Sequence, residues 1–401
     1  MARPNRNHLD DLRGATRIAI DASTGITDIV ERMHRTIQRR PWPLGTAPSD
    51  STRGITGFVY RRVRGTMRIV GKGLDATLAP VAALLPQGDS TPGRDAFVSA
   101  MNGVCGDYLE RTGNPLAIEM TLRHRGRRVD VSDPGRTLGG SLESASACRL
   151  LVLVHGLCMN DRQWTREGHD HGAALADELG YTPLYLRYNS GLRVGDNGRR
   201  LSGLLESLLR NWPHPVQELS IVGHSMGGLV ARSACHHGRE QKRAWLATLR
   251  RLVFLGTPHH GAPLERGGHG LDFVMALSPY SAPFTQLGRT RSAGIQDLRH
   301  GSITMRPDEF VPLPAGVSCH AAAATLASRR SVLAERLVGD GLVPLDSALG
   351  HHADRARRLA LPKDRQWVGF GMGHLELLNR PEVYAQLKRW LGSDRPQSSD
   401  S

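Results

Sequence analysis

The sequence predicts an α/β fold over residues 111–392, with a mostly parallel central sheet flanked by helices. Three observations predict it. Short apolar runs alternate with segments of helical periodicity, which is typical of proteins with a parallel sheet. One apolar run leads through Gly-His-Ser-Met-Gly (residues 223–227) directly into a helical pattern. A last helical segment, 381–391, carries its apolar side chains on one face, as a helix that covers a sheet does.

Each expected strand is a short apolar segment bounded by polar or glycine-rich turns. Eight such segments occur: 116–123, 127–131, 150–154, 183–188, 219–222, 252–255, 317–323 and 367–370. The expected helices lie between or after them, at 172–179, 199–209, 227–236 and 381–391. The proline-rich interval 264–314 interrupts this alternation, and an insertion of that length is often functional, so we expect it to be lid-like.

The two ends of the chain differ from this domain. Residues 1–110 mix helical patterning with glycine and proline, and we expect an N-terminal helical, basic and amphipathic region there. Within it, residues 53–72 carry six basic side chains and no acidic one. Two interpretations stay open: an interfacial segment that binds an anionic membrane or lipid surface, and a helical support packed on the α/β domain. Residues 393–401 form a polar tail.

Composition narrows the class of protein. The chain has 401 residues and a net charge of +14, and 39% of its residues are hydrophobic, enough for a sizeable core. No apolar run approaches the roughly 18–20 residues that a membrane span needs, and no secretory signal is visible. We therefore expect a cytoplasmic protein, whether or not it is peripheral to a lipid surface. Aromatic residues make up 5%, and no nucleic-acid-binding signature occurs, so no nucleic-acid partner is expected.

Ser225 is the candidate nucleophile. It lies at the centre of G-x-S-x-G between an apolar strand and a helix, the context in which that motif is meaningful. Gly223 and Gly227 lack side chains, so the strand and the helix can approach each other closely. The helix that begins after Ser225 stabilises negative charge near its N-terminus.

A serine hydroxyl needs a general base, and in this arrangement the acid and then the histidine follow the serine along the chain. His374 comes directly after the last expected strand, in a glycine-rich turn, and is the candidate base. Asp340, in Gly-Asp-Gly, is the candidate acid that orients the imidazole. Asp346 is an open alternative, and Asp354 is a weaker one.

A tetrahedral intermediate also requires an oxyanion hole. The backbone N–H groups of Met226, which follows the nucleophile, and of Leu157, in the loop after strand 150–154, are the candidate donors, with Cys158 as the fallback. His155 is expected to hold that loop by a hydrogen bond. The five cysteines are odd in number and scattered, so we expect reduced thiols. No spacing matches a metal template, including the set His259, His260, His269 and Asp272, so neither a metal nor a cofactor is predicted.

These motifs carry a family resemblance. His155-Gly-Leu, Gly-His-Ser-Met-Gly-Gly, Gly-Asp-Gly-Leu-Val-Pro and Gly-His-Leu resemble the lipase and esterase branch of the α/β-hydrolase superfamily. The segment Leu-Gly-Thr-Pro-His-His-Gly-Ala-Pro-Leu-Glu (residues 255–265) is similar to one in GPI inositol-deacylase-like hydrolases and their bacterial lipase relatives. The resemblance spans roughly residues 115–392 and implies an α/β-hydrolase fold with Ser225, Asp340 and His374 as the triad and Leu157 and Met226 as oxyanion donors.

The function expected from these residues is a serine hydrolase that cleaves carboxylic esters of small-molecule or lipid-like substrates. An acyltransferase or a thioesterase uses the same machinery and stays open as an alternative. So does a lipid-surface module in residues 1–110 that carries the hydrolase domain. Neither the acyl chain length nor the oligomeric state can be deduced from the sequence.

Overall fold

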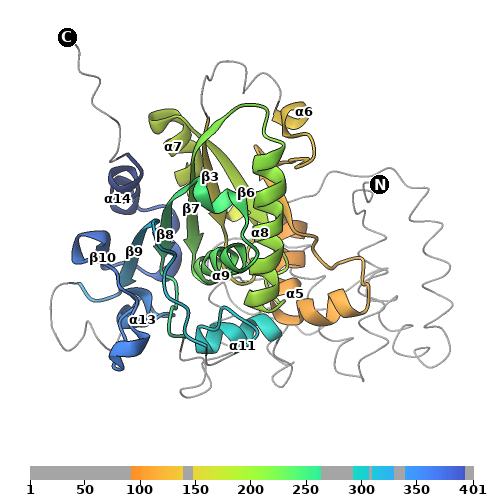
Figure 1. Cartoon of the computed structure of the whole chain (residues 1–401). Helices are drawn as coiled ribbons and strands as arrows, with labels where there is room; N and C mark the ends of the chain where they lie inside the picture. Colours follow the sequence, from red (N-terminus) through yellow and green to blue (C-terminus); the bar gives the residue numbers. More distant parts are fainter. Residues whose placement is uncertain (1–91, 139–147, 263–291, 307–308, 329–338, 393–401) are drawn as a thin grey trace, which may run out of the picture.

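The computed structural model describes residues 92–138, 148–262, 292–306, 309–328 and 339–392 (Figure 1). Several predictions from the sequence therefore lie outside the described residues. These are the basic amphipathic segment 53–72 with most of the N-terminal region, the larger part of the lid-like interval 264–314, and the polar tail 393–401.

The described residues form a central eight-stranded sheet with the order β10-β9-β8-β7-β3-β6-β1-β2. Six neighbouring strands are parallel, from β10 to β6, and β1 and β2 extend the sheet antiparallel at one edge. The strands are β1 (Thr121–His124), β2 (Arg127–Arg128), β3 (Cys148–Val154), β6 (Tyr181–Arg187), β7 (Val216–His224), β8 (Leu249–Leu255), β9 (Ser318–Thr325) and β10 (Gln366–Phe370). The mostly parallel sheet predicted from the sequence is thus confirmed.

The last two strands at the β2 edge of the sheet are shorter than the sequence predicts. β1 covers Thr121–His124, where 116–123 was expected, and β2 covers only Arg127–Arg128 of the expected 127–131. Leu116 and Ile118, before β1, bury their side chains in the apolar core, while the Asn102 side chain of α5 (Pro92–Arg111) hydrogen-bonds their backbone groups. The apolar pattern of these residues therefore reflects their burial in the core, although they do not pair as a strand.

Helices cover both faces of the sheet (Figure 1). The alternation of side chains along β3 shows how. Leu150 and Val152 belong to one apolar core, shared with α5, α8 and α9, whereas Leu151 and Leu153 belong to the other, shared with α7 and α14. The longer described helices are α5 (Pro92–Arg111), α7 (His171–Leu179), α8 (Val194–Arg210), α9 (Met226–Glu240), α11 (Ala293–His300) and α14 (Pro381–Gly392).

The sequence grouped residues 92–110 with the N-terminal region, but α5 packs into the core of the sheet. Its Met101 and Leu109 are almost fully buried in the same cluster as Leu150. The Ser292 hydroxyl, which precedes α11, donates to the Gly103 carbonyl of α5. Where the N-terminal region ends stays a prediction. No described helix is long and apolar enough to cross a membrane.

Two glycines of α8 provide a matched test of helix packing. A Cβ at Gly198 would lie 2.3 Å from the Ser233 Cβ of α9, whereas a Cβ at Gly203 would meet nothing within 4 Å. We expect Gly198→Ala to lower the free energy of unfolding by about 1–3 kcal/mol through overpacking. Gly203→Ala should raise it by about 0.5–1 kcal/mol, because alanine favours the helix over the unfolded chain. Urea unfolding of both variants measures this, and equal effects would contradict the α8–α9 contact.

Candidate active site

Ser225 lies where β7 ends and α9 begins. Its backbone has φ 55° and ψ −125°, a conformation that costs a non-glycine residue about 1–3 kcal/mol. The residue is fully buried, and its Oγ has no hydrogen-bond partner among the described residues. The Ser225 N–H donates to the Leu255 carbonyl at 2.8 Å, so the end of β8 holds the backbone of the turn.

Close packing around the turn requires glycine at two positions. A Cβ at Gly223 would lie 2.6 Å from the Gly228 Cα, and a Cβ at Gly227 would lie 2.1 Å from the Val154 carbonyl oxygen. Real Cβ atoms do not approach other atoms so closely, and here the obstructing atoms belong to backbone that cannot move aside cheaply. The strand–turn–helix arrangement expected from the sequence motif is the one observed.

Asp340 and His374 form a buried pair. The Asp340 Oδ2 lies 2.6 Å from the His374 Nδ1, and both side chains are almost completely buried. The other carboxylate oxygen, Oδ1, accepts from the Leu342 and Val343 N–H groups at 3.0 and 2.8 Å. The carboxylate is therefore fixed by its own turn and points its second oxygen at the imidazole. A carboxylate oxygen accepts, so the Nδ1 of His374 is the donor of this hydrogen bond, and its Nε2 has no partner among the described residues.

The backbone around His374 is also held in place. The short helix η7 (His374–Leu378) begins at this residue, and the Glu376 carboxylate accepts from the Gly373 N–H at 2.6 Å. The His224 ring, next to Ser225 in the chain, lies 4.8 Å from the His374 ring and donates from Nε2 to the His374 carbonyl at 3.2 Å. Burial holds the pKa of His224 well below its usual value, so this ring is neutral. No role for His224 was predicted from the sequence, although its position inside the G-x-S-x-G motif was the available signal.

The segment after β8 links the two candidate side chains. Leu255 accepts the hydrogen bond from Ser225, and the next residue, Gly256, has φ 58°. A Cβ at Gly256 would lie 3.0 Å from the His374 Cε1, so the imidazole rests directly on this glycine. Ser225 and His374 thus contact consecutive residues of one strand end, at the carboxyl edge of the sheet where α/β proteins place their ligands.

The loop after β3 lies beside Ser225. A Cβ at Gly156 would lie 3.0 Å from the Ser225 Cβ. His155 holds this loop as expected, because its Nδ1 bonds the Gly156 carbonyl at 2.8 Å and its ring stacks on Tyr188. The Cys158 N–H is already used, since it donates to the Ser190 hydroxyl at 3.1 Å. That contact disfavours Cys158 as an oxyanion donor and leaves the buried Leu157 as the candidate in this loop.

The two alternative acids lie elsewhere. Asp346, in α13 (Leu345–Ala348), is exposed and pairs with the exposed His351 at 3.4 Å. Asp354 caps a short helical turn by accepting from the Ala356 N–H. Neither carboxylate is bonded to His374, whose Nδ1 is taken by Asp340.

A different set of residues from the one considered in the sequence could hold a metal ion. Of the set His259, His260, His269 and Asp272, only the first two belong to the described residues. Within that part of the chain, His236, His237 and Glu240 place ligand atoms within 4.8 Å of one another, near the C-terminus of α9. The Glu240 side chain is 56% exposed, and both histidines already contact it, so an ordinary surface cluster explains the arrangement.

Comparison with known proteins supports the family resemblance. Residues 198–326 match the family of the PGAP1-like alpha/beta domain. The matched stretch includes Ser225 with β7, α9, β8 and β9, and here the chain resembles PGAP1-like hydrolases of the lipase and esterase branch. Asp340 and His374 lie beyond the matched stretch. No curated protein matches the sequence.

Solved structures of bacterial and archaeal proteins are similar at low identity. The mature lipase BlEst2 of Bacillus licheniformis is 18% identical, with a TM-score of 0.41 over 61% of this chain and 91% of that one. A thermophilic esterase of Thermogutta terrifontis is 17% identical, with a TM-score of 0.38 over 62% and 90%. The esterase PF2001 of Pyrococcus furiosus is 14% identical, with a TM-score of 0.37 over 62% and 82%.

The cysteine near the site is predicted to be unreactive. Cys158 is fully buried against α5, and burial raises its pKa well above the usual range. All five cysteines are buried and unpaired, and burial raises the pKa of Cys105 and of Cys319 to about 12. Because the thiolate is the reactive form, we expect almost no reaction of the native protein with a disulfide reagent at pH 8. All five thiols should react after unfolding in guanidinium chloride.

The burial of Cys158 would be contradicted if one thiol of the native protein reacted rapidly and that reaction was lost in Cys158→Ser. The matched control is Cys235→Ser, which removes another buried thiol, on α9.

Proposed function

We propose that this protein is a serine hydrolase that cleaves carboxylic esters, with Ser225 as nucleophile, His374 as general base and Asp340 as the orienting acid. The observation that carries the proposal is the buried Asp340–His374 hydrogen bond of 2.6 Å. The His374 imidazole rests on Gly256, and the preceding residue, Leu255, accepts the hydrogen bond from the Ser225 N–H. A nucleophile, a base and an orienter at one sheet edge make up the arrangement that acyl transfer requires.

In the first half-reaction, the Ser225 Oγ attacks the carbonyl carbon of the ester while His374 Nε2 takes the hydroxyl proton. Asp340 keeps Nδ1 protonated and stabilises the imidazolium that forms. His374 then returns the proton to the leaving alcohol as the bond from the acyl carbon to the alkoxy oxygen breaks. In the second half-reaction, water gives its proton to His374 and attacks the acyl carbon. The bond from that carbon to the Ser225 Oγ then breaks, His374 returns the proton to Oγ, and the carboxylic acid leaves.

The backbone N–H groups of Leu157 and Met226 are proposed to stabilise the oxyanion. Met226 is the first residue of α9, where N–H groups have no acceptor within the helix and the helix dipole favours negative charge. The contact between Gly156 and Ser225 supports Leu157 as the second donor. Cys158 is the weaker candidate, because its N–H already donates to the Ser190 hydroxyl. Removal of a single oxyanion donor typically costs about 10²–10³ in kcat in other hydrolases.

A lipid-like ester is the proposed substrate class within this reaction. The support is the resemblance to the PGAP1-like domain and to proteins that are described as lipases and esterases. The site also lies at a buried position, where an acyl chain would leave water. The preferred length of the acyl chain separates a lipase from an esterase, and a series of esters with acyl chains from two to sixteen carbons measures it.

Ser225→Ala tests the nucleophile. We expect it to abolish labelling by a fluorophosphonate and to lower kcat on p-nitrophenyl esters by several orders of magnitude, because triad members act as a unit. Esters of acyl chains from two to sixteen carbons, used as competitors of labelling, rank the substrates in the same experiment.

The matched control is Ser233→Ala. Ser233 is also buried, lies on α9, and has an Oγ without a partner among the described residues. The Ser233→Ala variant should react with the fluorophosphonate and hydrolyse p-nitrophenyl esters as the unmodified protein does. Labelling that survives in Ser225→Ala and disappears in Ser233→Ala would refute the assignment.

Asp340→Asn tests the acid. The amide keeps an oxygen for the Leu342 and Val343 N–H groups, but it cannot stabilise an imidazolium as a carboxylate does. We expect kcat/KM to fall by about 10³–10⁴, with little change in the unfolding midpoint. Asp346→Asn, at an exposed position, should change kcat/KM less than about twofold. A larger loss of kcat/KM in Asp346→Asn than in Asp340→Asn would identify Asp346 as the orienting acid.

A further inference from the structure

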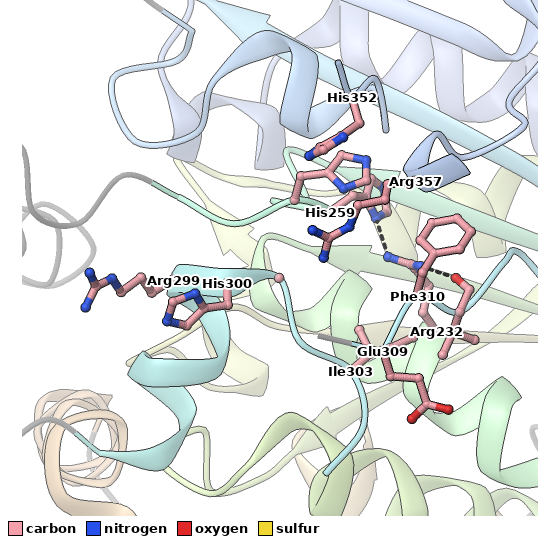
Figure 2. A pocket seen from close by; sticks show the side chains of 12 residues that line it. Arg232, His259, Arg299, His300, Ile303, Glu309, Phe310, His352 and Arg357 are labelled. Atoms are coloured by element: carbon pink, nitrogen blue, oxygen red, sulfur yellow. Dashed lines mark hydrogen bonds between the residues drawn. The ribbon is translucent and has the colours of Figure 1, made fainter. Parts of the chain in front are cut away.

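A second site lies apart from the proposed triad. A cavity of about 220 Å³ opens beside α9, between the loop that follows β8, the C-terminal end of α11 and two later loop segments (Figure 2). The residues that line it are Arg232, His259, His260, Arg299, His300, Gly301, Ile303, Glu309, Phe310, Val311, His352 and Arg357. Neither Ser225 nor His374 is among them. Arg232 lies seven residues after Ser225 on α9, about 10 Å along the helix axis.

The lining of this cavity is strongly basic. Among the described residues, three arginines line the cavity with one carboxylate, that of the exposed Glu309. Four histidines line it too, but burial lowers the pKa of His259 and of His260, so these two rings are neutral. In Figure 2 the basic side chains come from four separate parts of the chain, with Arg299 and His300 on α11 and Arg232 on the opposite side. Arg232 and Arg357 carry permanent positive charge at this cavity, and a cleft lined by charge of one sign attracts anions.

Arg232 is the buried charge at the base of this site. Its exposed fraction is only 5%, and it donates to the Val311 carbonyl at 2.7 Å and to the His259 Nδ1 at 3.2 Å. Its Nε has no acceptor among the described residues. The nearby titratable groups that act on it are the Cys319 and Cys235 thiols, not carboxylates, and burial lowers its pKa to about 10. A buried guanidinium without a counter-ion is costly, because neutral acceptors only partly replace its hydration.

His259 supplies a second buried donor. Because Arg232 donates to the Nδ1 of His259, that nitrogen must be an acceptor, and the neutral ring carries its proton on Nε2. The side chain is buried with an exposed fraction of 3%, and its Nε2 has no partner among the described residues. Packing against Phe254 at 4.6 Å fixes the ring orientation. A buried N–H without an acceptor normally has a partner in the functional state.

We propose that this cavity binds a small oxyanion, either inorganic phosphate or the phosphoryl group of a small molecule. The fork of N–H donors on Arg232 matches a tetrahedral oxyanion, and His259 Nε2–H adds a neutral donor. Arg357 and His352, from the loop after α13, close the site from the solvent side, since both are more exposed than Arg232. The proposal does not depend on the reaction at Ser225.

Calorimetric titration of the full chain with inorganic phosphate tests the proposal. We expect one saturable site in a low-salt buffer at pH 7.5. Arg357→Ala removes an exposed lining arginine and should weaken phosphate binding about three- to tenfold without affecting folding. Arg355→Ala is the matched control, because Arg355 is an exposed arginine of the same turn, η5 (Arg355–Arg357), and does not line the cavity. It should bind phosphate as the unmodified protein does.

Arg232→Gln should weaken phosphate binding at least about tenfold, and Arg357→Ala keeps the test decisive if that variant fails to fold. Titration with glycerol 3-phosphate separates the two sources: binding tighter than that of phosphate indicates a phosphorylated small molecule, and equal or weaker binding indicates the free ion. Absence of saturable phosphate binding, or equal weakening by Arg357→Ala and Arg355→Ala, would overturn the proposal. Binding of acetate but not of phosphate would overturn it as well.

Discussion

The approach of three strand ends around Ser225 is the constraint on which the rest of the site depends. Ser225 adopts a backbone conformation that costs a free residue about 1–3 kcal/mol, and neighbouring strands must supply that energy. β3 lies so close that Gly227 has no room for a Cβ, and β8 accepts the Ser225 N–H. The serine is thus held by backbone contacts, which do not relax when a side chain rotates. In the function that we propose, a serine whose backbone is fixed in this way needs little reorganisation before it reacts.

The Asp340–His374 pair depends on the same principle of fixing a group through its backbone. Two N–H groups of the Asp340 turn hold one carboxylate oxygen, so the other has a single direction available to it. Glu376 caps the helix that starts at His374, and the neutral His224 ring donates to the His374 carbonyl. The imidazole is therefore positioned from both sides.

Charge is distributed unequally between the two sites. At the proposed triad, a carboxylate of the protein accepts the hydrogen bond from the buried histidine. At the cavity beside α9, the acceptors of the buried Arg232 among the described residues are neutral, and Arg357 adds positive charge. α9 begins at the first site and carries Arg232 of the second, so one helix spans both. In the triad, the partner of His374 is the Asp340 carboxylate of the protein itself. At the cavity, the proposed partner of Arg232 is an anion from solution.

The sequence by itself determined the parallel α/β class and the turn at Ser225. These follow from local patterns: the alternation of apolar runs with helical segments, and two glycines whose spacing lets β7 and α9 pack together. The sequence could not choose between Asp340 and Asp346, because chain position does not say which carboxylate turns toward His374. The tertiary structure places the Asp340 carboxylate against His374 and places Asp346 in α13, beside His351. It also turned the apolar residues before β1 into core contacts, and brought Arg232 and Arg357 to one cavity although 124 intervening residues separate them. Contacts between residues so distant in the chain leave no periodicity, so only the folded arrangement reveals them.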